Sequence, residues 1–136
     1  MLSGGDLRSE GRAADVAAFV IGDPPRLADL CALLTNDDKL LRARACMAME
    51  VLSRTHPELL VPVMDDLLAA AAVESVAQAR WHLAEIFTCV PLTDAQKART
   101  TEVLKGYLGD KSKIVRFCAA KALETILEGE YLHLLS

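Results

Sequence analysis

The chain has 136 residues, a net charge of −4, a hydrophobic content of 52% and an aromatic content of 4%. This length suffices for one domain, and this hydrophobic content excludes an intrinsically disordered chain. The low aromatic content argues against a β-sandwich or barrel, whereas the 21 Ala and 22 Leu residues favour helices. The acidic balance argues against general nucleic-acid binding, because contacts with phosphate require Lys and Arg.

Taken in chain order, the sequence predicts helices over residues 7–21, 25–35, 38–54, 57–72, 75–90, 93–108 and 112–128. A Gly-Asp-Pro-Pro segment separates the first two helices, and the turn at residues 35–38 offers an Asn or Asp side chain as the next N-cap. Pro62 is predicted to kink the fourth helix or to delay its start by one turn. Thr93 is the predicted N-cap of the sixth helix, and Gly129 is predicted to end the seventh.

Residues 34–52 are repeated in residues 108–126. Identical residues stand at the aligned pairs Leu34/Leu108, Lys39/Lys113, Arg42/Arg116, Ala45/Ala119, Ala48/Ala122 and Glu50/Glu124, and apolar residues at pairs such as Cys46/Ala120 and Met49/Leu123. Residues 79–90 form a weaker middle copy, so that Arg42, Arg80 and Arg116 are 38 and 36 residues apart. A period of about 37 residues is typical of a repeat made of two helices.

The last copy reads Val-Arg-Phe-Cys-Ala-Ala-Lys-Ala-Leu-Glu-Thr-Ile over residues 115–126. It resembles the second helix of HEAT repeats, whose pattern is Val-Arg-x-x-Ala-Ala-x-Ala-Leu-x-x-Ile. The resemblance covers residues 25–128 and implies an all-α fold, an α/α superhelix (solenoid) of about three HEAT-like helix pairs with capping helices. The implied single domain spans residues 1–136, with an N-terminal cap helix (1–24), three repeats (25–55, 56–91 and 92–128) and a C-terminal tail (129–136).

Arg42, Arg80 and Arg116 occupy one repeat position. In HEAT-like families this arginine commonly pairs with an acidic residue in a neighbouring repeat or turn. The resemblance therefore implies a structural ladder in which Asp37, Asp38 and Asp110 are the candidate partners. A contact with phosphate or with an acidic peptide is the alternative role for these arginines.

The positions that the repeat pattern leaves free are the candidates for partner binding, because the second helices of HEAT-like solenoids line the concave face. Trp81 and Phe117 share one such position, and an exposed aromatic strip would bind a peptide or a helix. Burial of both rings against the first helices is the alternative, since aromatic side chains bury large areas. The candidate partner-binding residues are Arg44, Met47, Trp81, His82, Glu85, Phe117 and Lys121.

The sequence contains no spacing typical of a catalytic, metal or cofactor site. Its four Cys residues lie far apart, with no Cys-x-x-Cys pair, which is typical of free thiols in a reducing cytoplasm. No run of apolar residues is long enough to cross a bilayer. We therefore expect a cytoplasmic, non-enzymatic interaction module or scaffold that binds a protein or peptide on its concave face, without cofactor, metal, membrane or nucleic acid.

Two other functions remain as alternatives. One is a HEAT-like enzyme or enzyme accessory, similar to bilin lyases or to DNA glycosylases. The glycosylases have a basic and aromatic concave face, which this sequence matches only in part, through Arg44, Arg80, Trp81 and Lys121. The other is a structural protein that forms homo-oligomers through its terminal helices. The apolar residues 131–135 and 19–21 are the candidate patches for that association.

Overall fold

The computed structural model describes residues 10–135, and the side chains of residues 12–128. Between residues 10 and 135 there is no β-strand, and the chain forms seven α-helices. They are α1 (Glu10–Gly22), α2 (Leu27–Ala32), α3 (Lys39–Thr55), α4 (Met64–Val73), α5 (Ala77–Cys89), α6 (Asp94–Tyr107) and α7 (Lys113–Leu135). Four 3₁₀ segments join them: η1 (Pro24–Arg26), η2 (Leu33–Thr35), η3 (Pro57–Leu59) and η4 (Val61–Val63). The prediction of an all-α chain is confirmed.

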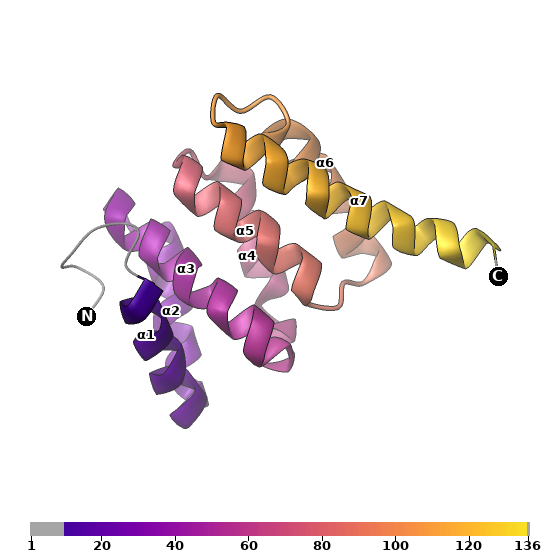
Figure 1. Ribbon diagram of the computed structural model, residues 1–136. Coiled ribbons are helices and arrows are strands. Elements are labelled where there is room, and N and C mark those ends of the chain that lie inside the picture. Colours follow the sequence, from indigo (N-terminus) through magenta and orange to yellow (C-terminus); the bar gives the residue numbers. More distant parts are fainter. Residues whose placement is uncertain (1–9, 136) are drawn as a thin grey trace.

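The helices lie in two rows that follow the chain order (Figure 1). In the front row α3 packs on α1, α5 on α3 and α7 on α5. In the rear row α2 comes first, η2 contacts α4, and α4 packs on α6, which also packs on α7. In the front row α3 and α5 each have a neighbour on both sides, whereas α1 and α7 each have one, because they stand at the two ends of the row among the residues that the structure describes.

Alanines at the repeat positions are buried between these rows. Ala45 and Ala119 are 0% exposed, and Ala48 and Ala122 are equally enclosed. Small side chains there let the helix axes approach closely, and large side chains such as Phe87 fill the space beside them. The alanines that recur in the sequence are therefore contact positions between helices.

Local signals set most of the helix boundaries. The Asp38 carboxylate accepts a hydrogen bond from the Leu40 backbone N–H at 2.9 Å and caps α3, and Thr93 caps α6 through a reciprocal capping box with Gln96. Pro62 lies in η4, and α4 therefore begins only at Met64, about two turns after the predicted start at residue 57. The predicted helix over residues 25–35 is divided into η1, α2 and η2.

The prediction that Gly129 ends the last helix is wrong, because α7 continues through it to Leu135. A single glycine costs only about 1 kcal/mol in a helix, and the residues on both sides of it favour helix. The helix start predicted at residue 7 and the side chains of the apolar patch at 131–135 lie outside the residues that the structure describes.

Candidate functional site on the outer face of α5 and α7

The three repeated arginines hold the loop that precedes their own helix. Arg42 Nη1 donates to the Asn36 carbonyl at 2.9 Å, Arg80 Nε to the Glu74 carbonyl at 2.6 Å, and Arg116 Nη1 to the Asp110 carbonyl at 2.7 Å. In each case the acceptor stands six residues before the arginine.

The first two arginines also reach the next loop along the chain. Arg42 Nε and Nη2 donate to the two carboxylate oxygens of Glu74 at 3.0 and 3.2 Å, and Arg80 Nη1 donates to Asp110 Oδ2 at 2.6 Å. Asp110 is thus the partner of Arg80. The expectation for Asp37 needs correction: only its backbone carbonyl contacts Arg42, at 3.2 Å, because the carboxylate that faces Arg42 comes from the loop after α4.

The environment of Glu74 favours its charged form. Burial by itself raises the pKa of this carboxyl, but hydrogen bonds from Arg42 and from the Val76 and Ser75 backbone N–H groups outweigh burial, and the pKa is lowered overall. The pKa of Asp110 is lowered chiefly by the Ser112 backbone N–H, with Arg80 adding to the effect. The arginines of this ladder are therefore occupied by loop carbonyls and carboxylates within the chain.

Three of the predicted partner-binding residues are buried, which corrects their assignment to an open face. Arg44 and His82 are 3% exposed and Met47 is 4% exposed. Arg44 and His82 occupy the same repeat position as Cys118, and in α5 and α7 this position faces the preceding helix of the front row. His82 on α5 lies 3.0 Å from Glu50 on α3, and Glu85 on α5 is a hydrogen-bond partner of Cys118 on α7.

The position shared by Trp81 and Phe117 becomes more exposed along the front row. Its counterpart in α3, Ala43, is 1% exposed, Trp81 is half-buried against the core, and Phe117 is 68% exposed. All eight residues from Ala43 to Glu50 are buried, so α3 is enclosed on every side, whereas α7 ends the row. Glu85 is half-buried, and Lys121 is exposed one turn after Phe117.

A buried polar cluster lies directly beneath this surface, between α3 and α5. Glu50 contacts His82 Nδ1 through Oε1 at 3.0 Å and Arg54 Nη1 through Oε2 at 3.0 Å. Trp81 Nε1 also lies 3.2 Å from His82 Nδ1. One imidazole nitrogen cannot donate to Glu50 and accept from Trp81 at the same time, so these two contacts exclude each other in any one protonation state. The imidazole of His82 therefore points inward, toward Glu50 on α3.

Three of the thiols, those of Cys31, Cys46 and Cys118, are poor nucleophiles in their surroundings. Burial raises the pKa of Cys31 and of Cys118 to about 11, and burial also raises the pKa of Cys46. Among the described residues no group of His, Cys, Asp and Glu side chains is arranged to hold a metal ion. None of the helices in this part of the chain is both long and apolar enough to cross a bilayer.

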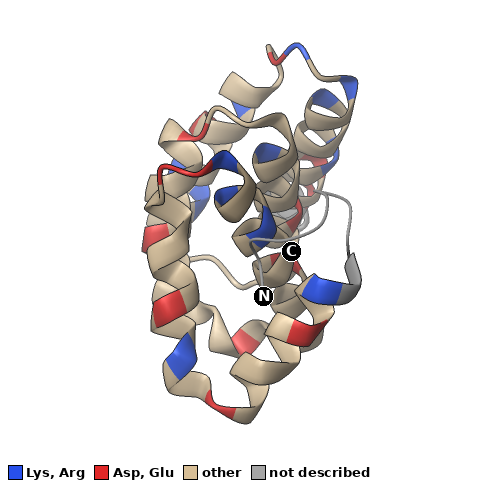
Figure 2. Ribbon diagram, turned by 90° about the vertical axis from the view of Figure 1, so that its left-hand side faces the viewer, with Lys and Arg blue, Asp and Glu red and all other residues tan. Residues whose placement is uncertain are grey.

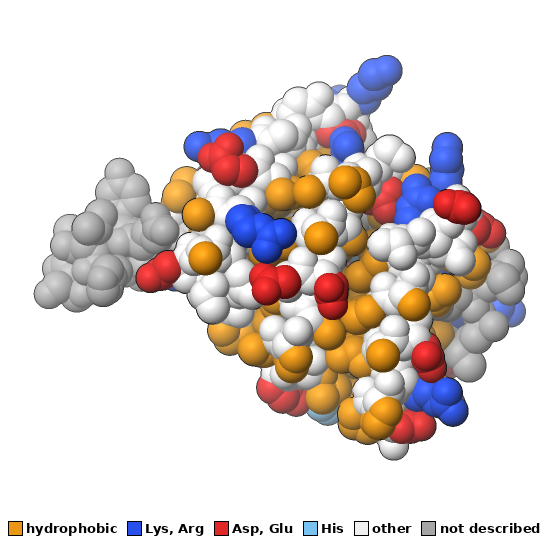
Figure 3. All heavy atoms as spheres, turned by 180° about the vertical axis from the view of Figure 1, so that it is seen from behind, with side chains coloured by type: hydrophobic (Ala, Val, Ile, Leu, Met, Phe, Trp, Pro, Cys, Tyr) orange, Lys and Arg blue, Asp and Glu red, His pale blue; other side chains and the backbone are white. Residues whose placement is uncertain are grey.

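The charged side chains are of mixed sign along the helices, as the side view in Figure 2 shows. On the opposite face from Figure 1, apolar side chains reach the surface between charged ones (Figure 3). Comparison of the chain with protein-family models, with curated proteins and with solved structures finds no match. The function is therefore inferred from the arrangement of the residues themselves.

Proposed function

We propose that the chain is a non-catalytic protein-interaction module, built as a short HEAT-like solenoid, that binds a protein partner on the face of α5 and α7 that carries Trp81 and Phe117, which is the concave face of the proposed solenoid. The internal repeat and the two rows of helices in chain order support the solenoid. The exposure of Phe117 carries the binding proposal. It is 68% exposed, although its repeat counterpart Ala43 is 1% exposed and its counterpart Trp81 is half-buried.

The surroundings of Phe117 are those of an interface anchor. Ile114, one turn earlier on α7, is 49% exposed, and Lys121 follows one turn later. Trp81 and Glu85 stand at the equivalent positions on α5, the neighbouring helix of the front row. Burial of an aromatic side chain against a partner contributes about 1.5–3 kcal/mol, and aromatic anchors with a polar rim dominate many interfaces. A peptide or helix with apolar residues facing Phe117 and a carboxylate near Lys121 is the complementary ligand.

The nucleic-acid alternative is weakened by the same geometry. Arg44 is 3% exposed, and Arg80 pairs with Asp110 and lies 5.0 Å from the Tyr107 ring centroid. Of the three cations that suggested a basic face, Arg44 is thus buried, and Arg80 is paired with a carboxylate within the chain. The proposed ligand is accordingly a protein segment and not a phosphate backbone.

Photo-cross-linking from position 117 tests the proposal. A benzophenone amino acid placed there in the full chain should capture a partner in extracts of the source cell, and the purified partner should bind the wild-type chain with a measurable Kd. Phe117→Ala should weaken that binding by about tenfold or more, which is the usual loss at an aromatic hot spot.

Phe19 supplies the matched control. It is 54% exposed on α1, at the other end of the front row. The cross-linker at position 19 should capture no common partner, and Phe19→Ala should leave the Kd unchanged. Equal losses for Phe117→Ala and Phe19→Ala, with both variants folded by circular dichroism, would contradict binding at α5 and α7.

A further inference from the structure

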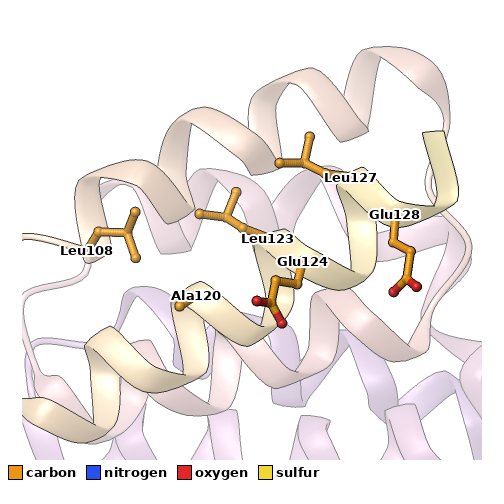
Figure 4. A pocket seen from close by; sticks show the side chains of 6 residues that line it. All are labelled: Leu108, Ala120, Leu123, Glu124, Leu127 and Glu128. Carbon is orange, nitrogen blue, oxygen red and sulfur yellow. The ribbon is translucent and has the colours of Figure 1, made fainter. Parts of the chain in front are cut away.

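A second surface lies at the open edge of the last helix pair, on the side of α7 that faces α6. A shallow groove there has a floor of apolar side chains and two carboxylates beside it, lined by Leu108, Ala120, Leu123, Glu124, Leu127 and Glu128. Leu123 and Leu127 point from α7 toward α6, while Glu124 and Glu128 point away from that floor (Figure 4). Leu108 and Leu127 are each 41% exposed.

The internal repeat shows what covers such an edge elsewhere in the chain. Four of the lining residues, Leu108, Ala120, Leu123 and Glu124, align with Leu34, Cys46, Met49 and Glu50 of the first copy. The four residues of the first copy are between 0% and 8% exposed, because α5 packs on α3 and α4 packs on η2. In the middle copy the counterparts of Ala120 and Leu123 are Ala84 and Phe87, 0% and 1% exposed beside α7. In the first and middle copies, this edge is thus covered by the next helix of the front row.

The same comparison indicates the charge of a helix that would cover this edge. Glu50 pairs with His82, a residue of the helix that covers its edge, at 3.0 Å. Glu124 is the repeat equivalent of Glu50 and is exposed. Within the described part of the chain, no ion pair involves Glu124 or Glu128. Two adjacent carboxylates beside an apolar floor favour a ligand with a basic side chain.

We propose that this groove binds an amphipathic α-helix of another protein, which lies along α7 as α7 lies along α5 and carries a His, Lys or Arg side chain opposite Glu124. The apolar stripe of that helix would cover Leu108, Leu123 and Leu127. A second copy of this chain is the less suitable occupant. Its free front-row helix would be α1, whose exposed side carries Asp15 as well as Arg12 and therefore offers Glu124 no net positive charge.

The helix that already covers this kind of edge provides the probe. A fluorescent peptide with the α5 sequence Ala77–Cys89 contains His82 and is stapled on the opposite side, because an isolated helix of this length is marginal in water. Fluorescence anisotropy with the full chain should give saturable binding that strengthens as the pH falls through the ordinary imidazole pKa, about 6.5. Glu124→Lys should weaken binding by about tenfold, through like-charge repulsion.

A charge exchange separates a specific pair from general electrostatics. The peptide carrying His82→Glu should bind the Glu124→Lys chain better than it binds the wild-type chain. Glu58→Lys is the matched control, because Glu58 is an exposed carboxylate in η3 and lies outside the groove, and it should leave the Kd unchanged.

Three outcomes would overturn the proposal. Absence of binding up to millimolar chain would show that the groove takes no such helix. Equal affinity of wild type and Glu124→Lys would place the peptide elsewhere, including at the chain's own α5 position. Sedimentation that reveals a dimer of the chain, abolished by Glu124→Lys, would make a second copy the occupant. None of these results depends on Phe117, so the binding proposed for the face that carries Trp81 and Phe117 is tested separately.

Discussion

Replacing Arg42 by Met should be the most destabilising change in the arginine ladder. The substitution keeps an unbranched apolar stem and removes the guanidinium that donates two hydrogen bonds to Glu74 and one each to the Asn36 and Asp37 carbonyls. The Glu74 side chain is 4% exposed and that of Arg42 is 16% exposed, so water replaces the lost contacts poorly.

The cost follows from this burial. Removing one partner of a buried ion pair typically costs about 3–5 kcal/mol. Glu74 keeps the backbone N–H donors of Ser75 and Val76, at 2.8 and 3.0 Å, which places the expected loss near the lower end, about 3 kcal/mol. With an unfolding entropy of about 2.1 cal/mol/K per residue, this loss lowers Tm by about 10 °C.

Urea and thermal unfolding followed by circular dichroism measure the effect. Arg99→Met is the control, because Arg99 and its partner Asp65 are 51% and 73% exposed, and such a pair contributes under about 1 kcal/mol. Adding Glu74→Met to Arg42→Met should recover part of the loss, since no buried charge then remains unpaired. If Arg42→Met and Arg99→Met destabilise equally, the ladder does not hold the helix pairs together in the way argued.

Three smaller effects are expected. Because the pKa of Glu74 is lowered in the folded state, its charged carboxylate stabilises the fold. This contribution is complete above the unfolded glutamate pKa of about 4.3 and is lost as the pH falls through the folded-state pKa. Glu74→Gln should therefore reduce the loss of stability at acid pH, as measured by urea unfolding at a series of pH values. Thr93→Ala removes the capping box of α6 and should cost about 1 kcal/mol in the same assay, whereas Thr125→Ala, within exposed helix, should cost less. Gly106→Ala should stabilise the chain by about 0.5–1 kcal/mol, because a Cβ there meets no atom within 4 Å and alanine favours helix; a loss of stability would show that α6 needs the glycine.

Sequence reasoning located the ladder arginines but only one of their carboxylate partners. A repeat alignment reveals a position that recurs, and Arg42, Arg80 and Arg116 recur at 38 and 36 residues. Glu74 lies between α4 and α5, where the alignment of the middle copy is weakest, and so it was missed. Its position six residues before Arg80, like that of Asp110 before Arg116, is the signal that could have found it.

The exposure of the candidate binding residues could not be predicted in the same way. Arg44, His82 and Cys118 share a repeat position that looks open on an isolated helix, yet all three are buried, and His82 and Cys118 contact the helix before them in the front row. A helical wheel places residues around one axis and contains no information about a neighbouring helix. A polar residue such as His82 can be buried only because Glu50 is supplied from another helix.

The amino-acid sequence by itself determined the helical class, most of the boundaries and the repeat, because these depend on local propensity, capping residues and apolar spacing. Only the tertiary structure decided which repeats are covered. Ala43, Trp81 and Phe117 have one position in the pattern and three different exposures, and Glu50 and Glu124 differ in the same way. The physical reason is that burial of a repeat is a property of its neighbours: among the residues that the structure describes, α3 lies between two front-row helices, and α7 has a front-row helix on one side only.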